Sequence, residues 1–129
     1  MARILLCDDE DAVRAFVKRA IEMDGHEVVL AIDGADGFDR LTAERGAFDL
    51  LLTDIRMPMM DGIALALSAA RDYPDLTILL MTGYADQRER AAGLDALIHD
   101  VVTKPFSLAQ IRAAVAEALS AAEETRLSA

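Results

Sequence analysis

Three carboxylates, a hydroxyl and an amine are the side chains of this sequence whose types and positions could do chemistry together. Each sits where an apolar stretch gives way to polar residues; they are Asp8, Asp9, Asp54, Thr82 and Lys104. If the apolar stretches are parallel strands, these residues all fall at carboxyl ends, the edge at which open α/β sheets build their sites. Such a set of groups on one edge predicts a site for magnesium and a phosphoryl group.

Magnesium prefers hard oxygen ligands, and Asp8 or Asp9 together with Asp54 could supply two carboxylates from neighbouring strands. Asp54 could then act as a carboxylate nucleophile and form an acyl phosphate. Lys104 would bring a compact positive charge to the phosphoryl oxygens, and Thr82 could donate a hydrogen bond to them. Each residue alone is more often a cap, a turn residue or a solvated side chain, so the prediction depends on their joint placement.

The elements that must position these residues alternate between strand and helix along the chain. Predicted strands cover Arg3 to Cys7, His26 to Ala31, Asp49 to Thr53, Thr77 to Met81 and Asp100 to Thr103. Predicted helices cover Asp11 to Met23, Asp33 to Arg45, Ile63 to Asp72 and Ala85 to Leu94, and a last one starts after its cap Ser107. Five repeats of strand and helix predict an α/β fold, a doubly wound (βα)5 three-layer sandwich.

Composition narrows the class of protein. The chain has 129 residues, 53% of them hydrophobic, which predicts a single domain with a real core. Its net charge is −10 and it has no run rich in lysine or arginine, which argues against a nucleic acid or an anionic membrane as partner. The one cysteine, Cys7, fits a reducing compartment. With no apolar stretch at the N-terminus long enough for a signal peptide, we expect a soluble cytoplasmic protein.

The motifs of nearly the whole chain, Arg3 to about Leu119, resemble the receiver domain of two-component response regulators. The matching motifs are Asp8-Asp9, Thr53-Asp54-Ile55-Arg56-Met57-Pro58, Asp61-Gly62, Thr82-Gly83-Tyr84 and Lys104-Pro105-Phe106. The resemblance implies a CheY-like, flavodoxin-like fold with a five-stranded parallel sheet in the order 2-1-3-4-5. It also implies that Asp54 is phosphorylated from a sensor histidine kinase or a phosphotransfer protein. The chain would then be no enzyme in its own right, but a phosphoacceptor that assists its own phosphorylation and dephosphorylation.

The same resemblance implies a set of ligands for the metal. Magnesium would be held by Asp9, Asp54 and the backbone carbonyl of Arg56, while Asp8 would act through a metal-bound water. Thr82 would contact the phosphoryl group. These assignments come from the family pattern and add to the carboxylate cluster argued above.

Further positions of the pattern concern the switch between signalling states. Lys104 would contact the phosphoryl group, and the peptide bond before Pro105 would be cis. Arg56 and Tyr84 match positions that tune how long the phosphoryl group survives. Receivers commonly carry Tyr or Phe three residues before the lysine, but this chain has Val101 there.

Because that aromatic residue is missing, we expect Tyr84 to take over part of its role. Gly83, where alanine is frequent, would loosen the loop before the helix predicted from Ala85. That helix has few apolar anchors, so the sequence places its weakest element next to the switch.

The expected domain boundaries predict how the protein would pass on its signal. We expect a receiver domain over residues 1–122 and a short frayed tail over 123–129, with no output domain. A stand-alone receiver, as a monomer or weak dimer, would signal by switched contacts with a downstream protein. The segment from Val101 to Phe106 is similar to CpdR-type single-domain receivers, which influence substrate delivery to an energy-dependent protease. A protease adaptor system is therefore one candidate target.

Other functions fit the same residues. The chain could be a phosphotransfer intermediate or a phosphate sink. A magnesium-dependent aspartyl-phosphate phosphohydrolase is disfavoured, because such enzymes usually need an acid two residues after the nucleophile and position 56 is Arg. A receiver-like module that never takes up phosphate is disfavoured by the intact acids and Lys104.

Overall fold

Five short apolar runs form one parallel sheet. The computed structural model describes residues 1–83 and 85–128. Its strands are β1 (Arg3–Cys7), β2 (Glu27–Ala31), β3 (Leu50–Asp54), β4 (Thr77–Thr82) and β5 (Asp100–Thr103). They lie in the order β2-β1-β3-β4-β5, so the predicted topology is confirmed. The central strands β1, β3 and β4 are buried along almost their whole length, as strands covered on both faces are.

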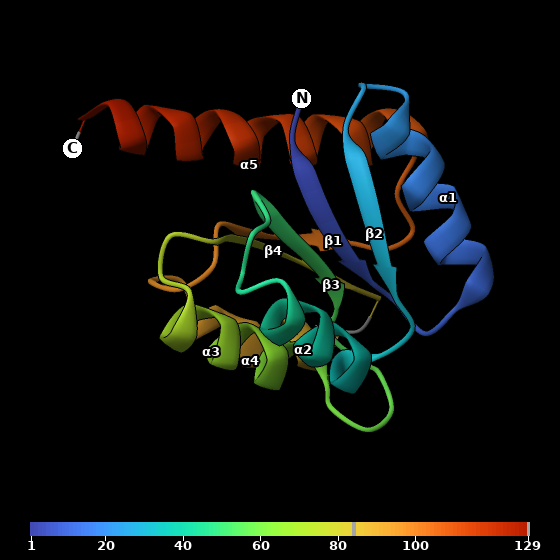
Figure 1. Ribbon diagram of the computed structural model, residues 1–129. Coiled ribbons are helices and arrows are strands. Elements are labelled where there is room, and N and C mark those ends of the chain that lie inside the picture. The colour runs from blue at the N-terminus through green and yellow to red at the C-terminus, as the bar shows by residue number, and fades with distance from the viewer. Residues whose placement is uncertain (84, 129) are drawn as a thin grey trace.

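Helices cover both faces of this sheet. They are α1 (Asp11–Glu22), α2 (Gly34–Ala43), α3 (Gly62–Asp72), α4 (Ala85–Ala92) and α5 (Leu108–Ser128). Figure 1 shows α1 and α5 on one face and α2, α3 and α4 on the other, which confirms the predicted three-layer sandwich. None of the helices in the described part of the chain is long and apolar enough to cross a membrane.

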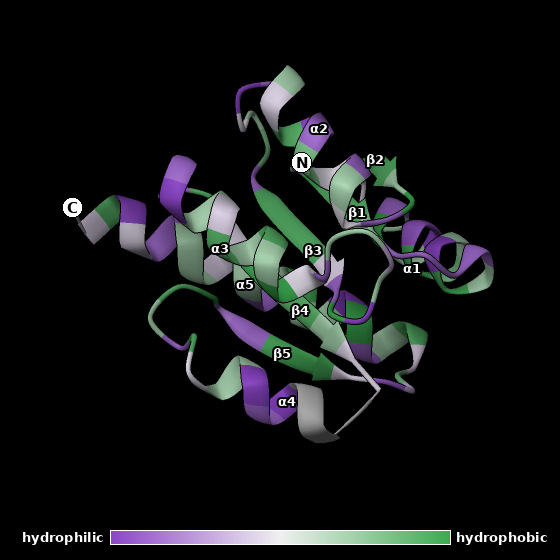
Figure 2. Cartoon of the chain, turned by 90° about the horizontal axis from the view of Figure 1, so that it is seen from below, coloured by the Kyte–Doolittle hydropathy of each residue, from purple (hydrophilic) through white to green (hydrophobic). Residues whose placement is uncertain are grey.

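Side chains that alternate along each strand supply two separate cores. In β1, Ile4 and Leu6 pack on the side of α1 and α5, whereas Leu5 and Cys7 pack on the side of α2 and α3. All four side chains are completely buried. Figure 2 shows the hydrophobic strands at the centre of the molecule and hydrophilic residues on the surrounding helices. The sheet is thus fixed from both sides and gives its edge residues a rigid base.

The end of the chain differs from the sequence prediction. We expected fraying after Ala122, but α5 continues to Ser128 and extends past the sheet (Figure 1). Residues 123–128 are exposed, so this part of the helix is stabilised by its own bonds and by residue types of good helix propensity. The hydroxyls of Thr125 and Ser128 each donate to a carbonyl one turn earlier.

Candidate functional site

The strand register brings the predicted site residues to one edge of the sheet. Cys7 of β1 is paired with Thr53 of β3, which places Asp8 and Asp54 side by side one residue further along. In the same way Thr82 of β4 is paired with Thr103 of β5, the residue before Lys104. The predicted juxtaposition of the five polar residues is therefore confirmed.

The three carboxylates form a cluster with an inner and an outer part. Asp8 is completely buried and Asp54 is 5% exposed, whereas Asp9 is exposed. One ligand oxygen from each lies within 4.8 Å of the others. The turn that carries Asp8 is fixed at two points, because its carboxylate accepts from the backbone N–H of Glu10 at 2.9 Å and its carbonyl accepts from Arg14 at 2.6 Å.

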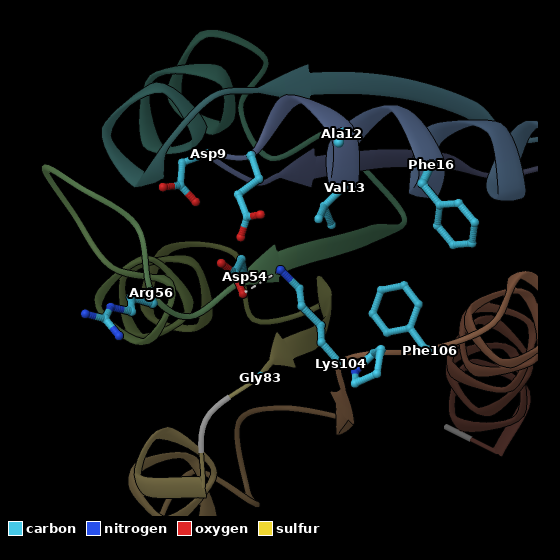
Figure 3. Close-up of a pocket in the computed structure, with 11 residues that line it drawn as sticks. Asp9, Ala12, Val13, Phe16, Asp54, Arg56, Gly83, Lys104 and Phe106 are labelled. Carbon is cyan, nitrogen blue, oxygen red and sulfur yellow. Dashed lines mark ion pairs between the residues drawn. The ribbon is translucent and has the colours of Figure 1, made fainter.

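Lys104 joins the inner two carboxylates. Its Nζ atom lies 3.1 Å from an oxygen of Asp8 and 3.2 Å from an oxygen of Asp54 (Figure 3). The lysine side chain is only 16% exposed. A partly buried ammonium in this position compensates the carboxylates and lies where it would meet a group attached to Asp54.

Burial and charge shift the protonation equilibria of this pair. Burial raises the pKa of Asp54 to about 6, with Lys104 lowering it and the neighbouring Asp8 and Asp9 raising it again. Burial by itself lowers the pKa of Lys104, but the charges of Asp54 and Asp8 outweigh it, so this pKa lies above its usual value. The site therefore carries more negative charge than its one lysine offsets.

These observations fit a hard divalent cation. The cluster offers three carboxylates, the donors that magnesium prefers, and the exposed Asp9 lies at its open side. Burial, with the charges of Asp8 and Asp9, raises the pKa of Asp54 despite the nearby Lys104, and a cation bound at the cluster would favour the ionised form of this carboxylate.

A glycine fixes the loop that follows Asp54. A Cβ atom at Gly62 would lie 2.0 Å from the backbone carbonyl oxygen of Asp54, so only glycine allows this approach. The N–H of Gly62 donates to the carbonyl of Ile55 at 2.7 Å, and Asp61 caps α3 by accepting from the N–H of Ala64. The loop from Asp54 to α3 is thereby closed on itself.

A cavity of about 750 Å³ opens beside Asp54. Its lining residues are Asp9, Glu10, Ala12, Val13, Phe16, Asp54, Arg56, Gly83, Lys104, Pro105 and Phe106. The rings of Phe16 in α1 and Phe106 after β5 lie 6.4 Å apart between centroids (Figure 3). Phe16 follows the apolar periodicity of α1, with Val13, Val17 and Ala20, but it is 40% exposed and forms an apolar rim of this cavity.

The remaining predicted residues other than Tyr84 lie in β4, in β5 and in the loops that follow β3, β4 and β5. Thr82 is buried at the end of β4, and Val101 is half-buried in β5. The bond between Lys104 and Pro105 is cis, as the family pattern implied. The side chain of Arg56 points away from Asp54 in Figure 3. Tyr84 lies outside the described residues.

The fold and this site define a CheY-like α/β protein with an acidic, lysine-bearing site at the carboxyl edge of its sheet. Residues 4–116 match the family of the response regulator receiver domain, and the chain belongs to that family. It is 38% identical over 111 residues to the response regulator MprA of Mycobacterium avium, covering 86% of this chain and 48% of that protein. The chain thus spans about half the length of the curated relatives it matches.

Solved structures agree with this assignment. A CheY-like receiver domain protein from Methanospirillum hungatei superposes with a TM-score of 0.87 at 29% identity, covering 97% of this chain and 98% of that one. The response regulator TrrA from Thermotoga maritima, in complex with Mg(2+)-BeF, gives a TM-score of 0.81 at 27% identity, covering 92% and 99%. These likenesses extend over nearly the whole chain.

Proposed function

We propose that this receiver domain is a phosphorylation-dependent signalling module of a two-component system, with Asp54 as phosphoacceptor. One observation carries the proposal: Asp54 lies at the base of an open cavity, within 3.2 Å of the Nζ atom of Lys104 and beside two further carboxylates. The family membership supports the same reading. The proposed domain covers residues 1–122, and the proposed compartment is the cytoplasm.

The proposed reaction is transfer of a phosphoryl group from a phosphohistidine of a sensor kinase or a phosphotransfer protein. A carboxylate oxygen of Asp54 attacks phosphorus, a P–O bond forms, the P–N bond breaks and its electron pair returns to the imidazole nitrogen. Positioning and charge neutralisation contribute most of the catalysis of such transfers. Lys104 is already within ion-pair distance of the attacking carboxylate and stabilises the added negative charge. Thr82, at the end of the neighbouring strand, donates to a phosphoryl oxygen.

The cofactor that we propose is magnesium. Asp9, Asp54 and the backbone carbonyl of Arg56 would hold it, with Asp8 acting through a bound water, and the carboxylate cluster is consistent with this set. When bound, the ion supplies positive charge to the phosphoryl oxygens. The Mg(2+)-BeF complex of the Thermotoga maritima regulator supports the choice of metal.

The donor protein approaches over the apolar rim of the cavity. Phe16 is partly exposed there and packs against Phe106, so a helix of the partner could cover both rings while its phosphohistidine reaches Asp54. Downstream, the phosphorylated domain signals by altered protein contacts rather than by turning over a substrate of its own. Gly83 lines the same cavity. We expect the loop that contains it to change its conformation when Asp54 is phosphorylated.

The test is phosphorylation by a small-molecule phosphodonor in the presence of magnesium, followed by peptide mapping of the acyl phosphate. Asp54→Asn removes the acceptor oxygen and should abolish incorporation while leaving the fold intact. Asp75→Asn is the matched control, because Asp75 is exposed in the loop between α3 and β4 at the opposite edge of the sheet. Equal phosphoryl incorporation in the wild-type protein and Asp54→Asn would refute the assignment.

A further inference from the structure

Over residues 88–92, helix α4 is held against the fold by two arginines and one buried alanine. Among its side chains that the structure describes, residues 88–92, only Ala91 is buried, whereas Arg88, Glu89 and Arg90 are exposed. Figure 2 shows the hydrophilic character of α4, next to β5. Most surface helices bury a broad apolar stripe, and α4 has too few such side chains in its described part to do so.

Arg88 ties α4 to the strand at the edge of the sheet. Its guanidinium donates to the hydroxyl of Thr103 at 2.6 Å and to the carbonyl of Val101 at 3.4 Å. Thr103 is the last residue of β5 and immediately precedes Lys104. Arg88 therefore contacts the backbone segment that positions the lysine of the site.

Arg90 ties α4 to the loop that precedes α3. It lies two positions further along the helix, about 200° around the helix axis from Arg88, and so reaches the other side. Its Nη2 atom lies 2.9 Å from Oδ2 of Asp61, while the other oxygen of Asp61 caps α3. Asp61 belongs to the loop that follows Asp54 and precedes Gly62. The second contact thus reaches the segment that carries the phosphoacceptor.

We propose that Arg88 and Arg90 form a two-point latch that couples the position of α4 to the state of Asp54, an inference that rests on the proposed function. Arg88 contacts the segment that carries Lys104, and Arg90 contacts the loop that follows Asp54. Both contacts are partly exposed, so they are weak enough to open. The latch is closed in the arrangement where Lys104 pairs with Asp8 and Asp54. We infer that the latch favours the arrangement in which Lys104 pairs with both carboxylates. A phosphoryl group on Asp54 that draws Lys104 away from Asp8 would disfavour this arrangement and, by linkage, open the latch.

The first arm of the test measures how α4 is held in the protein without phosphodonor. The double variant Thr103→Val and Arg90→Gln removes the hydroxyl acceptor at one point and the charge at the other. Amide hydrogen exchange of α4 should become about fivefold faster, as expected for the loss of two exposed contacts. Arg112→Gln is the matched control, because it breaks an exposed pair with Asp24 that joins α5 to the end of α1. Unchanged exchange of α4 in the double variant refutes the latch.

The second arm measures coupling to the site with magnesium and beryllofluoride, a mimic of the phosphoryl group. Because the open latch no longer favours the unphosphorylated arrangement, beryllofluoride should bind the double variant about threefold more tightly than the wild type. Faster exchange of α4 with unchanged beryllofluoride affinity overturns the coupling. A wild-type protein that does not bind beryllofluoride at all overturns the proposed function instead. The hydrogen-exchange measurement tests the latch without beryllofluoride, so failure of the latch and failure of the proposed function are distinguishable.

Discussion

The Nζ atom of Lys104 lies 3.1 Å from a carboxylate oxygen of Asp8, a contact that joins residues 96 positions apart in the chain. Asp8 is completely buried, and its negative charge is stabilised by this ammonium and by the backbone N–H of Glu10. Because the same ammonium also contacts Asp54, a phosphoryl group on Asp54 would compete with Asp8 for Lys104. The arrangement of this one lysine thus depends on the chemical state of the site.

Replacing this lysine should destabilise the protein. Lys104→Met keeps most of the side-chain volume but removes the charge, and we expect the free energy of unfolding at pH 7 without magnesium to fall by about 1–3 kcal/mol. Magnesium affinity, measured by titration calorimetry, should be maintained or raised, because a competing cation has been removed. Lys18→Met, which breaks an exposed pair with Glu22, is the control and should change stability by less than about 0.5 kcal/mol. Equal urea unfolding curves for the two variants would contradict this role of Lys104.

The pKa of Asp54 predicts how stability depends on pH. This pKa is raised from 3.8 to about 6, so the folded protein holds the proton more tightly than the unfolded chain does. The resulting stabilisation is present below pH 3.8 and is lost as pH rises through about 6. Asp54→Asn does not titrate, so its stability relative to the wild type should increase across this window by up to about 3 kcal/mol. Urea unfolding from pH 4 to 7 without magnesium measures it, and a constant difference would disprove the shift.

The outer carboxylate should control binding of magnesium. Asp9→Asn removes one of the three clustered carboxylates, and we expect magnesium affinity to fall by about tenfold or more. Asp11→Asn is matched to it, because Asp11 is also near the start of α1 but its side chain is 92% exposed and pairs with Arg14. Calorimetric titration of both variants should separate them, and equal losses would mean that only the general acidity of this region attracts the ion.

The close approach at Gly62 predicts a strong effect of one added methyl group. Gly62→Ala would place a Cβ atom against the backbone of Asp54, so we expect a loss of about 1–3 kcal/mol in unfolding free energy and weaker magnesium binding. Gly93→Ala is the control, because a Cβ atom there would meet nothing within 4 Å. Thermal unfolding of both proteins tests the difference, and a Gly62→Ala variant as stable as the control would show that the loop adjusts freely.

The sequence was sufficient to predict the strands and the polar residues at their carboxyl ends, because apolar runs that end in polar residues reveal strand ends directly. The strands Arg3–Cys7 and Asp100–Thr103 have the predicted bounds. Periodicity did not reveal that Phe16 borders a cavity, since a helical stripe gives a direction but not what covers its margin. The residues alone also left open which of two adjacent acids, Asp8 or Asp9, is buried.

The contacts of Arg88 and Arg90 could not be predicted at all from the sequence. Exposed arginines are long and flexible, and their partners depend on how distant segments pack. The continuation of α5 beyond Ala122 was missed for a different reason. Helix propensity is a weak signal next to hydrophobic patterning, and the last turns of α5 have no apolar stripe to reveal them.

The exposed end of α5 has a mechanical consequence. Residues 123–128 continue the helix for about 9 Å beyond the packed part, at about 1.5 Å per residue. Such an arm magnifies rotation, because a small tilt of α5 about its buried residues Ile111 and Val115 moves the far end much further than the near one. A spectroscopic probe at Ser128 would therefore report motions of α5 that are too small to detect at the sheet itself.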